Sequence, residues 1–161
     1  MTKENINNVD NAELLGNLIF EIIPICEEKE ISIADKHGLL QAELKCLRSF
    51  GVDESLNNMD IAERMNLSPS RLSRIMDGLV KKECIIREIN KIDRRHMKLS
   101  LSRKGKILAN KLNDEFVDVH AEILKGIDIS EHESLIERMG NLNTAVEKWL
   151  QKKKLSFGKS M

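Results

Sequence analysis

The residues of this chain best suited to binding chemistry are basic side chains in the stretch from Arg64 to Lys106. The stretch holds 13 lysines and arginines against four acidic residues, a net charge of +9, although the whole chain balances 26 basic against 26 acidic residues. A local concentration of positive charge attracts phosphate groups and makes binding sensitive to salt. The pattern therefore favours a nucleic-acid partner, with a solvated charged surface as the alternative.

The elements that must position these charges are a short helix and a hairpin, both predicted between Ser68 and Ser102. Ser68 is a good N-cap, and Pro69 suits the first helical position, where its missing donor costs nothing. The inner side of this helix carries Leu72, Ile75, Met76 and Leu79, and its outer side carries Ser70, Arg74, Asp77 and Lys81, flanked by Arg71 and Ser73. Two β-prone runs follow, Cys84–Ile89 and Met97–Leu101, with Asn90–His96 as the polar turn between them.

A second helix is expected just before this one and completes a helix-turn-helix. Asn57 or Asn58 can cap a helix over Met59–Met65, after a short extended piece at Ser55-Leu56. Asn66-Leu67 joins it to the next helix. A helix followed by a basic-tipped hairpin suits duplex DNA, because the helix fits the major groove while the hairpin reaches the backbone or the minor groove.

A long amphipathic helix is predicted near the N-terminus, over residues 10–30. It should kink near residues 20–24 or be split there, because Pro24 removes a backbone donor and clashes with the preceding turn. A shorter helix over Gln41–Phe50 follows, and Gly51 is expected to end it in a left-handed cap.

Two further helices are predicted in the C-terminal part of the chain. The first begins at Ser102 and ends near residues 126–128, and the second opens with Ser130 and Glu133 as a capping box. Long end helices cannot all bury their apolar faces on so small a core, so a two-fold symmetric copy of the chain is the expected partner. A dimer would also set two reading helices about 34 Å apart, one turn of DNA.

The hairpin and its flanks carry a specific combination of residues: Leu79 to Lys82, Ile85, Arg87, Asp93-Arg94-Arg95, Leu99-Ser100-Leu101-Ser102 and Lys104-Gly105. In these positions, and over nearly its whole length, the chain resembles the MarR family of winged-helix transcription regulators. The resemblance implies a mainly α fold with a small β wing. It implies a winged helix-turn-helix lobe over residues 38–102 and dimerisation helices over 10–36 and 103–154. It further implies a homodimer on palindromic operator DNA, usually a repressor, released by a small molecule, a metal or thiol oxidation.

The resemblance also assigns DNA-binding roles to individual positions. By match of position, the residues facing the major groove are Ser70, Arg71, Ser73 and Arg74. Arg95 and Arg94 would enter the minor groove, with Asp93 orienting the wing arginine. The predicted DNA-binding set is completed by Ser68, Lys81, Arg87 and Lys98, of which the three basic residues are expected to contact phosphates. For Arg71 and Arg74 the alternative is a surface charge paired with Asp77 or Glu63.

Two places depart from the family pattern. Glu83 stands where glycine is common after the recognition helix, and a non-glycine residue in a left-handed cap costs about 1 kcal/mol. Residues 89–92 read Ile-Asn-Lys-Ile where proline and acidic residues are usual, so this wing is more basic and apolar.

An effector pocket is expected between the end helices and the DNA-binding lobe. Its candidate lining residues are Ile22, Cys26, His37, Leu40 and Leu44. No cofactor and no metal site are expected, because the four histidines lack close ligand spacing. Three cysteines without a paired CxxC spacing are expected to be reduced thiols, with Cys46 and Cys84 in the core and Cys26 buried on the apolar side of its helix rather than acting as a redox sensor.

The sequence also points away from several classes of protein. It contains no run long and apolar enough to span a membrane and no secretory signal, so a cytoplasmic location is expected. No catalytic constellation is recognisable, so the chain is not expected to be an enzyme. The favoured hypothesis is a sequence-specific transcriptional regulator that binds double-stranded DNA and acts as a repressor released by a small-molecule effector. The alternatives are a winged-helix protein-interaction module without DNA binding, or a metal or thiol-redox switch of the same regulator class.

Overall fold

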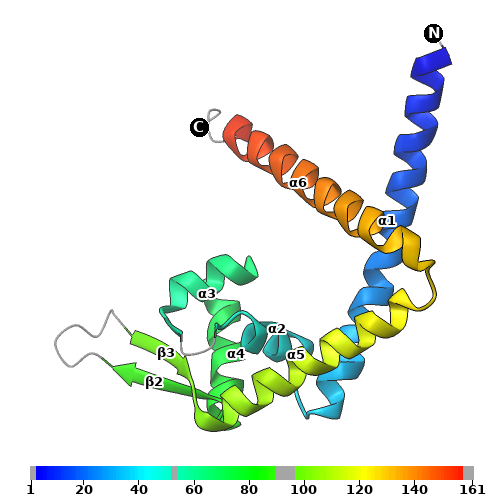
Figure 1. The fold of residues 1–161 in the computed structure, drawn as a ribbon. Helices are drawn as coiled ribbons and strands as arrows, with labels where there is room; N and C mark the ends of the chain where they lie inside the picture. The colour runs from blue at the N-terminus through cyan, green and yellow to red at the C-terminus, as the bar shows by residue number, and fades with distance from the viewer. Residues whose placement is uncertain (1–2, 52–53, 90–96, 158–161) are drawn as a thin grey trace. The chain divides into compact units, whose positions relative to one another are not determined.

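The computed structural model describes residues 3–51, 54–89 and 97–157 of the chain (Figure 1). In chain order its elements are α1 (Lys3–Lys36), α2 (Gln41–Arg48), β1 (Ser55–Leu56), α3 (Asn58–Met65), α4 (Pro69–Lys81), β2 (Ile85–Ile89), β3 (Met97–Leu101), α5 (Arg103–Leu124), a short 3-10 helix η1 (Ile129–Glu131) and α6 (His132–Phe157). The chain forms two compact units, residues 1–115 and 116–161. A mainly α fold with a small β wing is confirmed.

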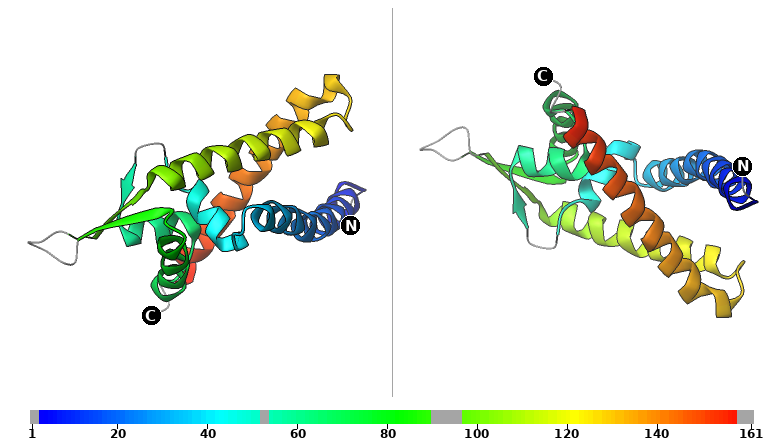
Figure 2. Two further views of the ribbon diagram at one scale, coloured as in Figure 1. Left: turned by 90° about the horizontal axis from the view of Figure 1, so that it is seen from below. Right: turned by 90° about the horizontal axis from the view of Figure 1, so that it is seen from above.

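The sheet is small and antiparallel, with the strand order β1-β3-β2. Arg87 lies opposite Leu99 in the β2–β3 ladder, and Ser55 lies opposite Ser100 where β1 adds to the other edge of β3. The two views in Figure 2 show the β2–β3 hairpin extending away from the helices of its unit. The predicted hairpin strands and the short extended piece at Ser55-Leu56 are therefore confirmed.

The core of the first unit lies between α2, α3, α4, the sheet and the beginning of α5. Its members include Leu44, Leu47, Ile61, Leu72, Leu79, Leu99 and Leu112, each at most 1% exposed. The last turns of α1 join this core through Ile33 and Ala34, which are 2% and 0% exposed. Both long helices that flank the lobe are thus anchored in it at one end.

Three helices of this unit end in the same hydrogen-bonded motif. After α1, α3 and α4 the chain passes through Gly38, Asn66 and Glu83, whose φ angles are 63°, 51° and 59°. In each case the next residue donates its N–H to the carbonyl five residues back, as Cys84 does to Leu79 at 2.9 Å. This is the Schellman arrangement, which favours glycine in the left-handed position. Glu83 therefore adopts the backbone that glycine would adopt, so the departure from the family pattern leaves the turn intact.

Two expectations about the N-terminal helices are settled by the structure. Of the two outcomes predicted at Pro24, a kink or a split, the split does not occur, because α1 runs from Lys3 to Lys36 with Pro24 inside it. A proline removes one hydrogen bond, and the turns on either side keep theirs. Nor does Gly51 form a left-handed cap, since α2 ends at Arg48 with Ser49 right-handed. Instead the N–H of Gly51 donates to Glu54 Oε2 at 2.8 Å.

The second unit contains the end of α5, η1 and α6. The predicted Ser130–Glu133 capping box is wrong, because Asp128 caps this turn instead, with its Oδ1 accepting from the N–H of Ser130 at 2.8 Å. The hydroxyl of Ser130, which donates to the same Oδ1 at 2.6 Å, and this N–H together hold the pKa of Asp128 below its ordinary value. Along α6 no side chain within residues 132–153 is buried.

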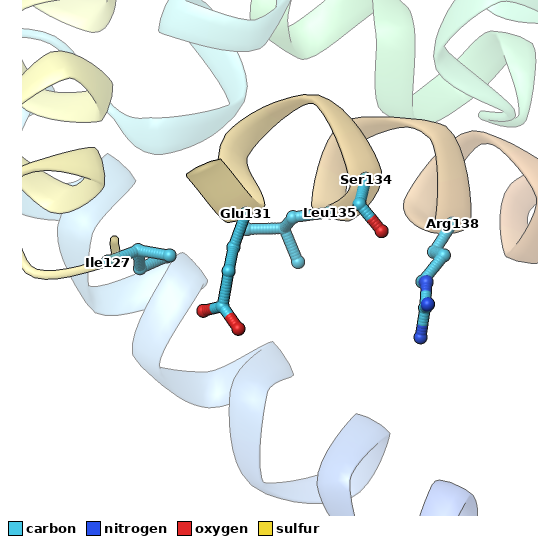
Figure 3. A pocket seen from close by; sticks show the side chains of 5 residues that line it. All are labelled: Ile127, Glu131, Ser134, Leu135 and Arg138. Carbon is cyan, nitrogen blue, oxygen red and sulfur yellow. The ribbon is translucent and has the colours of Figure 1, made fainter. Parts of the chain in front are cut away.

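A surface pocket of about 280 Å³ opens at the beginning of α6. Figure 3 shows the side chains that line it, Ile127, Glu131, Ser134, Leu135 and Arg138. Both charged members are exposed. Each wall of this pocket comes from the second unit.

Candidate nucleic-acid interface

Helix α4 presents two chemically distinct faces, as the sequence predicts. Its inner face packs into the core through Leu72, Met76 and Leu79, which are at most 1% exposed. The outer face carries the predicted DNA-binding residues Ser70, Arg71, Ser73, Arg74 and Lys81, all of them exposed. Ser68 occupies the N-cap position with an extended backbone, but its hydroxyl lies 3.3 Å from Ser70 Oγ and makes no cap hydrogen bond.

The arginines on this face form no ion pairs with the described residues. Within the described residues, neither Arg71 nor Arg74 has a hydrogen bond or salt bridge, so the alternative pairing with Asp77 or Glu63 is absent. Asp77 instead pairs with Arg87 of β2, at 2.6 Å between Oδ1 and Nη2. The helix thus offers two unpaired guanidiniums next to small hydroxyl side chains, a combination suited to base edges and phosphates.

The wing contributes two further predicted residues that the structure describes. Arg87 and Lys98 are both exposed, on β2 and β3. Asp93, Arg94 and Arg95, the predicted tip, lie outside the described residues, so their DNA contacts stay a prediction. The described part of the hairpin belongs to the same unit as α4 and contacts it through β2, where Arg87 bonds to Asp77 of α4.

An ion pair between Lys82 and the buried carboxylate of Glu43 ties α4 to α2. Glu43 is 2% exposed, and its carboxylate accepts from Lys82 Nζ and from the N–H of Leu40. Lys82 also donates to the carbonyl of Gly38 at 2.8 Å, so it joins the end of α1, the start of α2 and the end of α4. The carboxylate comes so close to α4 that a Cβ on Gly78 would lie 2.2 Å from Glu43 Oε1. Because the buried charge of Glu43 needs a partner, Lys82 has a structural role.

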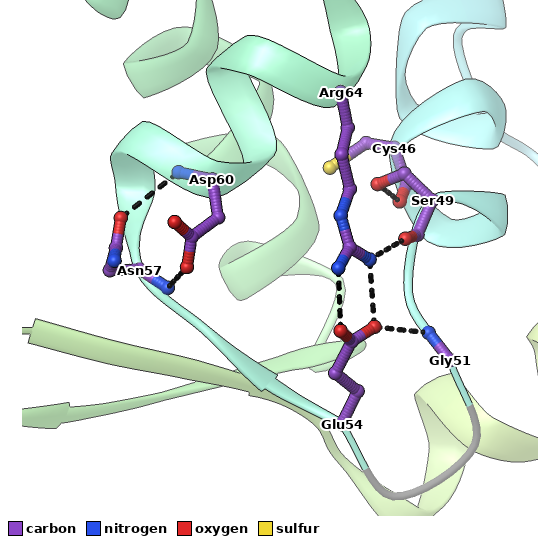
Figure 4. A network of polar contacts seen from close by, with 7 residues as sticks. All are labelled: Cys46, Ser49, Gly51, Glu54, Asn57, Asp60 and Arg64. Atoms are coloured by element: carbon purple, nitrogen blue, oxygen red, sulfur yellow. Dashed lines mark hydrogen bonds and ion pairs between the residues drawn. The ribbon is translucent and has the colours of Figure 1, made fainter.

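A second polar network joins α2, β1 and α3 (Figure 4). Arg64 donates to both carboxylate oxygens of Glu54, at 2.8 and 2.6 Å, and to the carbonyl of Ser49 at 2.8 Å. These bonds from Arg64, with that from the N–H of Gly51, lower the pKa of Glu54 to about 2. Arg64 is thus part of the scaffold, although it contributes to the positive charge of the segment.

The first turn of α3 explains the orientation of that helix. Asn57 is the N-cap, and its Oδ1 accepts from the N–H groups of Met59 and Asp60 at 2.8 and 3.0 Å. Asp60 Oδ2 in turn accepts from the N–H of Asn57, which completes a capping box. Of the two predicted caps, Asn57 is the one used.

Sequence reasoning missed both ion-pair networks for the same reason. Glu43 and Lys82 are 39 residues apart, and Glu54 and Arg64 are 10 apart. Only their three-dimensional placement identifies them as partners. The one sequence signal was Gly78, an interior glycine in a helix, which indicates a close approach when it is not a cap.

The predicted effector residues do not come together in a pocket within the described part of the chain. Leu44 is fully buried in the core, whereas Leu40, Ile22 and Cys26 are exposed. His37 is half-buried, and its Nε2 lies 2.7 Å from Glu115 Oε2. A separate cavity of about 100 Å³ is lined by Phe50, Leu101, Lys106, Ala109, Asn110 and Asn113, none of them a predicted effector residue. The effector pocket stays a prediction.

The two core cysteines are poorly suited to redox chemistry. Burial, with a smaller contribution from the charge of Glu43, raises the pKa of Cys46 to about 12. Burial also raises the pKa of Cys84. The reactive thiolate is therefore scarce at both sites. Among the described residues, no group of three or more His, Cys, Asp or Glu side chains is arranged to hold a metal ion, and no helix is long and apolar enough to cross a membrane.

Comparison with known proteins finds that the chain is similar to transcription regulators. A sequence model of the MarR family matches residues 39–97. The helix-turn-helix transcriptional regulator SarZ of Staphylococcus epidermidis is 29% identical over 139 residues, which cover 84% of this chain and 93% of SarZ. The transcriptional repressor MdtR of Bacillus subtilis is 40% identical over 73 residues, 45% of this chain and 47% of MdtR. The fold is also that of MepR from S. aureus, crystallised with DNA, with a TM-score of 0.69 at 16% identity over 82% of this chain and 97% of MepR.

Proposed function

Because this chain belongs to the MarR family, we propose that it is a sequence-specific regulator of transcription that binds a palindromic operator in double-stranded DNA as a homodimer. In this proposal residues 38–102 are the DNA-binding lobe, and residues 10–36 and 103–154 are the dimerisation helices. The regulator acts as a repressor in the cytoplasm and leaves DNA when it binds a small-molecule effector.

The observation that carries the proposal is the outer face of α4. Arg71 and Arg74 are exposed and unpaired within the described residues, although the opposite face of the same helix is almost completely buried. Two adjacent unpaired guanidiniums repel each other, so their presence on a rigid helix favours an anionic partner that fits the helix. SarZ and MdtR, which are helix-turn-helix regulators by name, support DNA as that partner.

Dimerisation is supported by the apolar surface of the long helices. On α1 the exposed large apolar residues include Leu14, Leu18, Ile22 and Ile25, which share one face of the helix. On α6 they include Ile136, Met139, Val146, Trp149 and Leu150. Apolar surface of this extent is favoured to be buried by a partner, and a second copy supplies the same surface by symmetry.

The test begins by selecting genomic fragments that the purified chain retains. The selected duplex is then titrated with the wild-type chain and with Arg74→Ala and Lys98→Ala, at one fixed salt concentration, by fluorescence anisotropy. Loss of a base contact costs about 1–3 kcal/mol and relaxes base preference, whereas loss of a phosphate contact weakens all sequences alike. We expect Arg74→Ala to reduce the preference for the selected duplex over a scrambled one more than Lys98→Ala does. Equal losses on both duplexes for both variants would show that α4 does not read bases.

A further inference from the structure

Asp77 is the single acidic residue of α4, and it lies on the face proposed to enter the major groove. A carboxylate at that place should repel the DNA phosphates. Its side chain is 54% exposed, so burial does not explain it. The contact with Arg87 is its one hydrogen bond to the described residues.

The path of the Arg87 side chain follows from the register of the sheet. Arg87 lies directly opposite Leu99, and directly opposed residues of antiparallel strands point to the same face. Leu99 is fully buried, so Arg87 begins on the face of the sheet that covers the core. The Arg87 side chain is nevertheless 33% exposed, and its guanidinium lies 2.6 Å from Asp77 Oδ1. Asp77 therefore fixes the charged end of an arginine that emerges between α4 and the hairpin.

We propose that Asp77 is a positioning residue that holds the guanidinium of Arg87 between α4 and the wing, where Arg87 binds the DNA backbone that separates the major groove from the minor groove. This inference rests on the proposed function. When a helix occupies one groove and the hairpin reaches the next, the phosphates between the grooves pass between those two elements. A guanidinium has five N–H donors, and the contact with Asp77 uses one of them, so others remain for phosphate oxygens.

The net-charge explanation and the positioning explanation predict opposite effects of Asp77→Asn on DNA affinity. If only net charge matters, removing a negative charge next to a polyanion strengthens binding. If Asp77 positions Arg87, loss of the carboxylate frees the Arg87 side chain to move away from the space between α4 and the wing. Ordering that side chain again costs conformational entropy when DNA binds, so affinity falls. The sign of the change in affinity therefore decides between the two explanations, whatever its magnitude.

The experiment measures the affinity of the selected duplex for the wild-type chain, Asp77→Asn, Arg87→Ala and the double variant, each at several salt concentrations. We expect Asp77→Asn to weaken binding about tenfold, the value of one charge-assisted hydrogen bond near the surface. The slope of log affinity against log salt should fall by about one, as for a lost phosphate contact. The double variant should bind no worse than Arg87→Ala, because both changes remove the same contact.

The matched control is Glu88→Gln. Glu88 is the next residue of β2 and is exposed, and it has no hydrogen bond or ion pair with the described residues. Removing its charge should leave affinity unchanged or raise it. Asp77→Glu, which keeps a carboxylate, should recover most of the affinity lost in Asp77→Asn. Urea unfolding of each variant establishes that it is folded under the assay conditions.

Two results distinguish failure of this inference from failure of the proposed function. A wild-type chain that prefers the selected duplex, together with an Asp77→Asn variant that binds it as tightly or more tightly, would overturn the positioning role alone. Additive losses in the double variant would overturn it as well. A wild-type chain that binds no duplex even at low salt would overturn the proposed function and, with it, this inference.

Discussion

Leucines of the winged lobe and leucines of the long helix α1 lie in opposite environments. Leu47, Leu79 and Leu99 of the lobe have no accessible surface, whereas Leu14 and Leu18 of α1 are 60% and 62% exposed. The lobe therefore encloses its own core. The first two-thirds of α1 contains no buried side chain among those described, and its apolar face is available to a partner. The difference teaches that the same residue type stabilises the monomer in one region and is expected to stabilise an assembly in the other.

Glycine-to-alanine substitutions should show the largest difference between the two regions, measured as a change in the free energy of unfolding. A Cβ on Gly105 would lie 1.9 Å from the carbonyl oxygen of Cys84, where α5 begins beside the end of α4, whereas a Cβ on Gly16 of α1 or Gly140 of α6 would have nothing within 4 Å. We expect Gly105→Ala to reduce the free energy of unfolding by about 3 kcal/mol or more. Gly16→Ala and Gly140→Ala should each raise it by about 0.5–1 kcal/mol, because alanine is the better helix former. Urea denaturation measures all three, and a neutral Gly105→Ala would contradict the tight packing of the lobe.

The second prediction concerns association. Replacing Leu18 and Ile22 together with glutamate should raise the dissociation constant of the dimer by about two orders of magnitude, because two apolar side chains lose their burial. Met59 of α3 is 80% exposed, so Met59→Glu is the matched change of an exposed apolar residue in the lobe. It should leave the dimer intact. Sedimentation equilibrium measures both, and equal effects would remove the distinction between the two regions.

The third prediction concerns the effect on stability of replacing Glu83, the residue with a left-handed backbone after α4. Glu83 has φ 59° at a position that glycine adopts without strain, and its contact with Lys104 is long, 3.4 Å, between two exposed side chains. Glu83→Gly should therefore raise the free energy of unfolding by about 1 kcal/mol. Gly38→Ala at the equivalent position after α1 should lower it. Thermal unfolding of the two variants gives the signs, and a destabilised Glu83→Gly would show that the glutamate side chain matters more than backbone strain.

The smallest expected effect is a dependence of lobe stability on pH. The pKa of Glu54 is about 2 in the folded chain because Arg64 and the N–H of Gly51 bind its carboxylate, against 4.5 for a free glutamate. A depressed folded-state pKa contributes stability that is present above pH 4.5 and is lost as the pH falls from there towards 2. In that window the wild-type chain should lose stability more steeply than Glu54→Gln. Identical pH profiles for the two chains would show that this ion pair does not act on folding.

Local sequence signals predicted much of the fold and of the recognition helix. Asn57, Ser68 and Pro69 identified where α3 and α4 begin, because caps act within one turn of the chain. The same kind of signal failed at Gly51 and Ser130, since a neighbouring residue, Ser49 or Asp128, took the cap instead. A local pattern shows that a turn is near, but competition between adjacent residues decides which one forms it.

Contacts between distant segments were not predictable in this way. No pattern in the sequence joins Glu43 to Lys82 or assigns Arg87 to Asp77, because these pairs form only when α4 packs on α2 and beside β2. As a result, the sequence identified the basic residues of the candidate site but did not separate those that hold the scaffold from those that remain available. Lys82 and Arg64 belong to the scaffold, whereas Arg71 and Arg74 have no partner among the described residues.

The most direct test of the account is a titration of the unmodified chain against the selected duplex and a scrambled duplex of equal length, over a range of salt concentrations. The account predicts binding of the selected duplex with two chains per site, a preference of about 10³-fold or more over the scrambled one, and affinity that falls steeply as salt is raised. Equal affinity for both duplexes, or no binding of either in dilute buffer, would contradict it.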